Sequence, residues 1–184
     1  LTNPQSFEAG IGEDNVAAGD VNDDGFADLI VGIFGGGEVS ILLGDGAGSF
    51  NLQSTISAGG NPFHIAVGDV NGDGYLDAAT ANWGSSTLGI VTTDGSGNFT
   101  GTTAYPVGST PAAVDLADLD GDGDLDAVTS NFGSGDYTIY WNDGAGNFGS
   151  PVSLPSTTAG SCCTVVDFDR DGDIDLATPD GPTD

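Results

Sequence analysis

The sequence has almost no positive charge. Lys and Arg together number one (Arg170) against 28 Asp and Glu in 184 residues, and the formal net charge is −27 at pH 7. Nucleic acids and anionic lipid surfaces attract proteins mainly through Lys and Arg, so the composition argues against both as partners. No apolar stretch approaches the ~20 residues of a membrane-spanning helix, and we expect no membrane insertion.

Residue types that commonly carry catalysis are also scarce. His64 is the single histidine, and no cluster of histidines or basic residues is present to act as a general base or to stabilise an anion. We therefore expect no enzymatic activity. The two cysteines, Cys162 and Cys163, cannot form a zinc site alone. Burial of Cys163 as a small apolar residue, a bond between the two, and a bond from Cys162 to another chain all remain open.

Methionine and helical periodicity are absent as well. The sequence opens at Leu1 with no visible signal peptide, so we expect a processed product or a segment of a longer protein. Glycine accounts for 32 residues, and the 38% of apolar residues recur in short clusters. This composition predicts an all-β domain with many turns, and the length is sufficient for one core.

A nine-residue acidic loop occurs four times, and successive copies begin 49 residues apart. In every copy, positions 1, 3, 5 and 9 carry side-chain oxygens and position 6 is glycine. Alternate side chains of such a loop point inward, and the main-chain carbonyl of position 7 adds an oxygen, so the pattern predicts about four Ca²⁺ ions per chain. The expected ligands are Asp20, Asn22, Asp24, Phe26 and Asp28; Asp69, Asn71, Asp73, Tyr75 and Asp77; Asp118, Asp120, Asp122, Asp124 and Asp126; and Asp167, Asp169, Asp171, Asp173 and Asp175.

The spacing of the loops favours calcium over the alternative of solvated acidic turns without a metal. Without a cation, three or four carboxylates this close would repel one another. Asn22 and Asn71 replace aspartate at position 3, so the first two sites should be the weaker ones. An EF-hand is not expected, because its loop has 12 residues, ends in glutamate and lies between helices, whereas strand-like stretches flank these loops.

Each complete repeat is predicted to contain four strands. First strands lie before the loops at Val16–Gly19, Ile65–Gly68, Val114–Ala117 and Cys163–Val166, and second strands follow them at Asp28–Phe34, Asp77–Trp83, Asp126–Phe132 and Ile174–Thr178. Third strands are expected at Val39–Leu43, Leu88–Thr92 and Tyr137–Trp141, and more polar fourth strands from about residues 51, 100 and 149. An Asp-Gly-x-Gly-x-Phe turn beginning at Asp45, Asp94 and Asp143 joins the third strand to the fourth.

Four antiparallel strands in ~40–50 residues is the period of a propeller blade. The acidic loop and the Asp-Gly-x-Gly-x-Phe turn together resemble the FG-GAP/VCBS repeat family, the integrin-like β-propellers, over nearly the whole chain. The resemblance implies that each loop binds calcium between the first two strands of a blade. We expect one domain, residues 1–184, forming an all-β propeller of about four four-stranded blades, with repeats starting near residues 11, 60, 109 and 158.

The fourth repeat is predicted to be incomplete. After its second strand, Pro179–Asp184 contains no third strand and no Asp-Gly-x-Gly-x-Phe turn. At the other end, Gln5–Ala9 is in register with Ser54–Ala58 and is predicted to be a fourth strand without its blade. The propeller would close on itself by sharing this blade, or another chain would complete it within an oligomer or an extracellular fibre.

These expectations favour an extracellular calcium-binding module for adhesion or assembly, in which calcium is structural. Millimolar calcium outside cells suits weak acidic loops. The expected partners are calcium and either other copies of the chain or extracellular proteins or glycans. A carbohydrate-binding lectin is the alternative, because similar propellers bind sugars between blades. Trp83 and Trp141 occupy repeated aromatic positions, for which core packing is favoured over a sugar platform.

Overall fold

The computed structural model describes residues 6–10, 12–156 and 162–178, and all regular structure in these ranges is β-strand. The strands are β1 (Glu13–Gly19), β2 (Asp28–Ile33), β3 (Glu38–Gly44), β4 (Phe50–Ser57), β5 (Pro62–Gly68), β6 (Asp77–Asn82), β7 (Thr87–Thr93), β8 (Phe99–Pro106), β9 (Pro111–Ala117), β10 (Asp126–Asn131), β11 (Asp136–Tyr140), β12 (Val152–Pro155), β13 (Thr164–Val166) and β14 (Asp175–Ala177). No helix long and apolar enough to cross a membrane occurs in the described residues.

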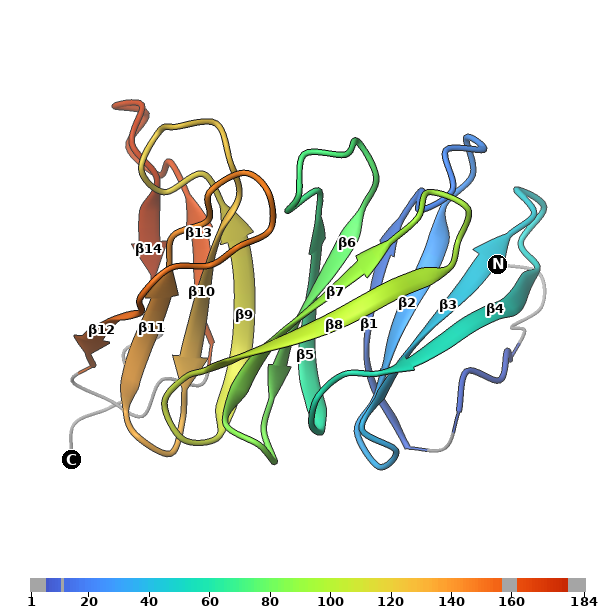
Figure 1. Cartoon of the computed structure of the whole chain (residues 1–184), viewed down its shortest axis with the longest axis horizontal. Coiled ribbons are helices and arrows are strands. Elements are labelled where there is room, and N and C mark those ends of the chain that lie inside the picture. The colour runs from blue at the N-terminus through green and yellow to red at the C-terminus, as the bar shows by residue number, and fades with distance from the viewer. Residues whose placement is uncertain (1–5, 11, 157–161, 179–184) are drawn as a thin grey trace.

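The strands form three complete blades and part of a fourth (Figure 1). The orders β1-β2-β3-β4, β5-β6-β7-β8 and β9-β10-β11-β12 are antiparallel sheets in which each strand pairs with the next along the chain. Strands β13 and β14 form a two-stranded sheet. The predicted four-stranded repeat is therefore confirmed, with strand ends within a few residues of those predicted.

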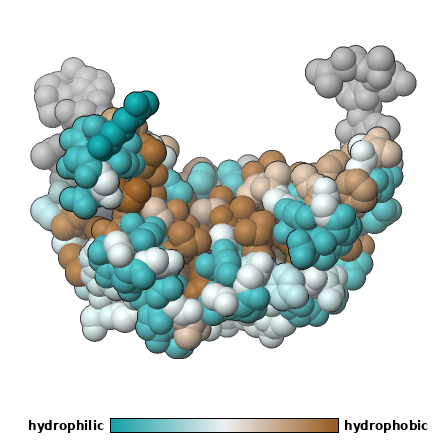
Figure 2. All heavy atoms as spheres, turned by 90° about the horizontal axis from the view of Figure 1, so that it is seen from above, coloured by the Kyte–Doolittle hydropathy of each residue, from teal (hydrophilic) through white to brown (hydrophobic). Residues whose placement is uncertain are grey.

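The blades stand side by side in an open crescent (Figure 2). The first strands β1, β5, β9 and β13 contact one another in succession, whereas the fourth strands carry mostly exposed or half-exposed side chains. We call the apolar contact between two neighbouring blades a seam. Buried residues from both blades form each complete seam, so the core is divided into clusters that follow the 49-residue repeat.

The N-terminal segment differs from its prediction. Gln5 lies outside the described residues, and residues 6–10 do not form a strand. Phe7 and Ala9 nevertheless pack on Val31 and Leu42 of the first blade, and the Ser40 hydroxyl donates to the Ala9 carbonyl at 3.1 Å. The segment thus occupies the place of a fourth strand, but in the described residues no third strand lies beside it to supply a hydrogen-bonding ladder.

The two cysteines are free and lie in different environments. Cys163 is buried in a cluster with Ala113, Val128 and Tyr137, which matches its interpretation as a small apolar core residue. Burial raises the pKa of its thiol to about 12, and the neighbouring Asp115 adds to the effect, so the thiol is protonated at neutral pH. Cys162 is exposed.

Candidate metal sites

The four acidic loops lie at the same end of the molecule, each between the first and second strand of its blade (Figure 1). The strands fix both ends of every loop, because position 1 follows a first strand and position 9 begins a second strand. In the third blade, for example, β9 ends at Ala117 and β10 begins at Asp126. Figure 2 views the molecule from this end, where hydrophilic loops alternate with apolar side chains.

Hydrogen bonds within each loop hold its oxygens in place. Position 1 accepts the N–H of position 6, as in Asp20 to Gly25 at 2.8 Å and Asp118 to Gly123 at 3.0 Å. The position-6 glycine has a positive φ in all four loops, between 86° and 102°, which only glycine adopts at little cost. The second oxygen of each position-1 carboxylate accepts a further main-chain N–H of the same loop, from Asp24, Gly72, Gly121 or Arg170. A cation would therefore share oxygens that already accept hydrogen bonds, since a carboxylate oxygen has two lone pairs.

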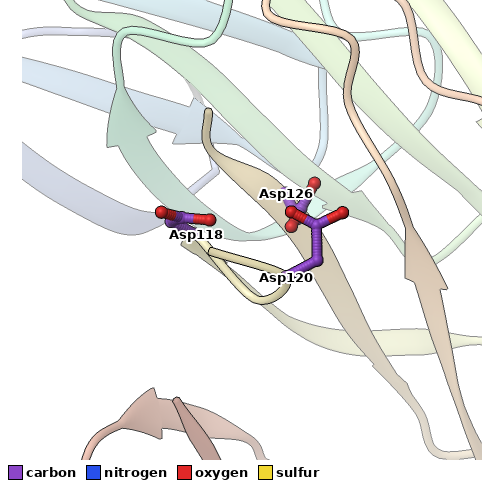
Figure 3. Close-up of side chains that lie close together, drawn as sticks. All are labelled: Asp118, Asp120 and Asp126. Carbon is purple, nitrogen blue, oxygen red and sulfur yellow. The ribbon is translucent and has the colours of Figure 1, made fainter. Parts of the chain in front are cut away.

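Positions 1, 3 and 9 converge in the loops that have aspartate at position 3. One oxygen each of Asp118, Asp120 and Asp126 lies within 4.8 Å of the others, and Figure 3 shows the three side chains around one space. The same holds for Asp167, Asp169 and Asp175. Calcium binds oxygens at about 2.3–2.6 Å, so oxygens up to ~5 Å apart can share one ion. The residues present therefore fit a calcium ion.

The remaining predicted ligands lie in the same loops but outside these groups of three. The position-5 carboxylates of Asp24, Asp73, Asp122 and Asp171 each accept the N–H of position 7 at 2.9 to 3.0 Å. In the first loop, the Asn22 amide also donates to the second oxygen of Asp24 at 3.0 Å. That bond would have to break for Asp24 to offer both oxygens, which favours the weaker affinity expected of this loop.

The position-9 aspartate ties the loop to the third strand. Asp28, Asp77 and Asp126 are 0%, 1% and 1% exposed. Both carboxylate oxygens of Asp28 are used, because one accepts the Val21 N–H at 2.9 Å and the other accepts the Gly44 N–H, at the end of β3, at 2.8 Å. The second and third blades repeat this pattern with Thr93 and Asn142 in place of Gly44.

Sequence reasoning identified the position-9 residues as ligands but missed this bridge. The donors on the third-strand side are main-chain N–H groups of Gly44, Thr93 and Asn142. Because these three residues share no side-chain type, the sequence contains no motif that marks them. One feature of the sequence did indicate that this part of the loop is buried, namely the apolar residue at position 2. It is Val21 in the first loop and Val70 in the second, and each is 1% exposed.

The electrostatics of the loops are unfavourable without a cation. Burial raises the pKa of Asp77 to about 6, backbone hydrogen bonds oppose the shift, and the charges of Asp73 and Asp69 add to it. Burial likewise raises the pKa of Asp126, and Asp120 and Asp122 add to the rise. A divalent cation at the loop centre would favour the ionised carboxylates and remove this penalty.

The Asp-Gly-x-Gly-x-Phe turn lies against the acidic loop of its own blade. A Cβ on Gly46 would overlap the ring of Phe26 at loop position 7, and Gly95 stands in the same relation to Tyr75. Both glycines also have a positive φ. In the third blade, the Asp124 carboxylate replaces the ring above Gly144. The glycine therefore leaves space for the position-7 side chain, while its main-chain carbonyl remains the expected ligand.

Neighbouring loops are connected through Asn142. Its amide donates to the Val70 carbonyl of the second loop at 2.7 Å and to the Leu125 carbonyl of the third loop at 3.0 Å. This buried side chain was not predicted as functional, since its counterparts in the other repeats are Gly44 and Thr93. The second and third loops thus share one hydrogen-bonded contact.

An arc of four-stranded antiparallel blades, with an acidic loop between the first two strands of each, is the architecture of a β-propeller module. The chain belongs to the FG-GAP-like repeat family, whose model matches residues 20–80, 69–129 and 127–178. This result confirms the resemblance seen in the two sequence motifs. No curated protein sequence matches the chain.

Solved structures share the fold at low sequence identity. An Agrocybe aegerita lectin, described as recognising non-reducing terminal N-acetylglucosamine, matches with TM-score 0.50 and 21% identity over 80% of this chain and 39% of its own. BBS1N in complex with ARL6DN matches with TM-score 0.61 and 15% identity over 92% and 53%. The V. cholerae biofilm matrix protein Bap1 matches with TM-score 0.55 and 16% identity over 94% and 30%. The chain thus spans about a third to a half of each.

Replacing Asp28 with alanine tests the bridge separately from metal binding. Two main-chain N–H groups, of Val21 and Gly44, would lose their acceptor, and each such loss costs about 1–3 kcal/mol. We expect Asp28→Ala to lower the free energy of unfolding by about 2–4 kcal/mol in urea with excess EDTA. Asp24→Ala is the matched control, because Asp24 is exposed and should cost much less under these conditions. Equal losses for the two variants would contradict the bridge.

Proposed function

We propose that the chain is an extracellular calcium-stabilised propeller module that serves adhesion or assembly. The observation that carries the proposal is the convergence of Asp118, Asp120 and Asp126 within 4.8 Å on a loop held by its own hydrogen bonds. Calcium has a structural role in this proposal: it neutralises carboxylates that otherwise repel and fixes the hairpin of each blade.

An extracellular location is proposed on two grounds. The acidic loops suit the millimolar calcium found outside cells. The second ground is a structural relative, Bap1, which is described as a biofilm matrix protein. For the role in assembly, a further relative, BBS1N, was solved in complex with a second protein. Both relatives favour a role in assembly over a role in catalysis, and no catalytic group is assigned to this chain.

Calcium removal should lower the melting temperature, and added calcium should restore it. An ion present at 100 times its Kd stabilises the native state by about 2.7 kcal/mol per site. In a domain of this size, 1 kcal/mol corresponds to about 2–4 °C, so chelation should lower Tm by at least ~10 °C. Asp122→Ala should reduce the calcium-dependent part of this shift more than its control Asp124→Ala, because Asp124 is expected to ligate through its carbonyl. An unchanged melt in excess EDTA would refute the structural role.

Calorimetric titration should reveal at least two classes of calcium site. Asn22 and Asn71 leave three carboxylates in each of the first two loops, against four in each of the others, and fewer charges give weaker binding at similar geometry. Asn71→Asp should move the second site into the tighter class without changing the total stoichiometry. Four equivalent sites in the unsubstituted chain would contradict the ranking.

A sugar-binding function is the second candidate, favoured by a row of aromatic side chains at the end opposite the metal loops. The ring centroids of Phe34 and Phe63 lie 6.2 Å apart, those of Phe63 and Trp83 5.2 Å, and those of Trp83 and Phe132 6.0 Å. Phe63 and Phe132 are 40% and 46% exposed. Trp83 is half-buried in this row and is not part of the buried clusters of the described residues. The expectation that Trp83 packs in the core is therefore only partly met.

A glycan array separates the two candidates. If the row binds sugar, one sugar class should bind with defined stoichiometry, and Phe132→Ala should weaken that binding while Phe26→Ala at the opposite end leaves it unchanged. Both phenylalanines are 46% exposed, which makes them a matched pair. The absence of any glycan signal would eliminate the lectin and leave adhesion or assembly through protein contacts.

A further inference from the structure

The third strand of the third blade carries a side chain at a position where the second blade has glycine. A Cβ on Gly89 of β7 would lie 2.6 Å from the carbonyl oxygen of Ala58, which belongs to the first blade. Thr138 of β11 is the counterpart of Gly89, 49 positions later, and has such a Cβ. Its hydroxyl accepts the Gly108 N–H of the second blade at 3.4 Å. The second blade therefore cannot approach the third blade at this point as closely as the first blade approaches the second.

A hydrogen bond joins the fourth strands of the first and second blades, and the sequence prevents its repetition in the next pair of blades. The Thr102 hydroxyl of β8 donates to the Ser57 carbonyl, at the end of β4, at 2.8 Å. The counterparts of Thr102 and Ser57 are Pro151 and Pro106. Because Pro151 has no hydroxyl to donate, this bond cannot form between the second and third blades.

A pocket of about 350 Å³ lies at this place between the second and third blades. Pro106 and Val107 of the second blade and Pro151 of the third blade form its apolar walls. Asp136, at the start of β11, is the one charged residue among those that line the pocket. No residue of an acidic loop contributes to the lining, so the pocket is separate from the candidate metal sites.

Three side-chain donors hold the Asp136 carboxylate in place. Its Oδ1 accepts the Ser134 hydroxyl and, at 3.1 Å, the amide of Asn131, which is 0% exposed. Its Oδ2 accepts the Ser153 hydroxyl at 2.8 Å. Burial raises the pKa of Asp136, but these three hydrogen bonds together outweigh the effect of burial and lower the pKa below its usual value. Asp136 is therefore ionised at neutral pH.

The polar atoms that stay open to the pocket are hydrogen-bond acceptors. A carboxylate oxygen has two lone pairs, so the two donors to Oδ1 of Asp136 use both of them. Among the described residues Oδ2 accepts one bond, which leaves it one lone pair. The Ser153 hydroxyl gives its hydrogen to Asp136, so its own lone pairs are free. Thr138 is only 4% exposed and adds little polar surface. A ligand of this pocket must therefore donate hydrogen bonds.

An ammonium group meets these conditions better than a guanidinium group or a sugar hydroxyl. It has three N–H donors, no acceptor and a positive charge. A guanidinium group pairs best with both oxygens of a carboxylate, but Oδ1 of Asp136 is already occupied. A sugar hydroxyl is neutral and gains nothing from the formal net charge of −27. The apolar walls of the pocket suit the methylene groups of a lysine side chain.

We propose that the pocket between the second and third blades binds the ammonium group of a lysine side chain on a partner polypeptide, with Asp136 Oδ2 and Ser153 Oγ as acceptors. None of the 184 residues is a lysine, so a second copy of this domain does not supply the group. The inference deepens the proposed role in assembly, on which it rests, because it names the chemistry of a partner. It does not depend on calcium.

A blocked peptide with one lysine, acetyl-Gly-Gly-Lys-Gly-Gly-amide, tests the pocket. We expect it to shift the main-chain amide signal of Gly108 saturably in NMR spectra of the isotope-labelled full chain with calcium present, because Gly108 lines the pocket. The same peptide with Nε-acetyl-lysine has no charge and should bind at least ~10-fold more weakly, since a charge-assisted hydrogen bond is lost. No saturable shift at Gly108, or equal binding of the two peptides, would overturn the proposal.

Asp136→Thr removes the carboxylate and keeps a side chain that the repeat accepts. Thr87 stands at this position in the second blade, where it accepts the Asn82 amide at 3.2 Å. The variant should therefore fold normally and bind the lysine peptide at least ~10-fold more weakly. Glu38→Thr is the matched control, because it removes the same charge at the same position of the first blade, and it should bind like the unsubstituted chain. Equal affinities of the two variants would place the ammonium group elsewhere and refute the proposal.

Further titrations distinguish the source of the ammonium group and its relation to calcium. If the free polyamine spermidine binds more tightly than the peptide and loses this advantage in Asp136→Thr, the occupant is a polyamine and the partner polypeptide is wrong. Binding of neutral monosaccharides with the same dependence on Asp136 would show that the ammonium group is wrong. Failure of the lysine peptide to bind alongside a normal calcium-dependent melt would refute the pocket alone, whereas the reverse result would refute the calcium role alone.

Discussion

The structure depends on one repeated interaction, the buried carboxylate at position 9 of each acidic loop in a complete blade. Asp28 accepts main-chain N–H groups from its own loop and from the end of the third strand, so it joins three segments of a blade at one point. The corresponding carboxylate of the third blade, Asp126, lies beside Asp118 and Asp120 in the third loop. Burial raises the pKa of Asp126 and its main-chain hydrogen bonds oppose this rise, so a cation beside it would add to the interactions that favour the ionised carboxylate.

The stability of each blade also depends on the neighbouring blades. No blade buries its apolar face alone, and each seam requires side chains from two successive repeats. Asn142 extends this dependence to the loops, since it donates to carbonyls of the second and third loops together. Loss of one loop should therefore loosen the next, so a cation bound in one loop would also stabilise the packing of its neighbour.

Much of this architecture can be predicted from the sequence because the strands and the acidic loops recur every 49 residues. The strands, the loops and the incomplete fourth repeat all follow from that period and from the alternation of apolar residues. The bridge from Asp28 to Gly44 could not be predicted, because its acceptors bind main-chain groups that any residue carries. Register alone predicts Gln5–Ala9 as a strand, but residues 6–9 form none, because a strand also needs a hydrogen-bonded neighbour, which register does not supply.

The placement of all four acidic loops at one end has an electrical consequence. Half of the 28 acidic residues of the chain stand at the four side-chain ligand positions, three in each of the first two loops and four in each of the others. The opposite end carries the aromatic row, so the molecule has a negative pole and an apolar pole. A cationic surface would orient the module with its loop end inwards, and calcium, by cancelling part of that pole, would weaken the preferred orientation.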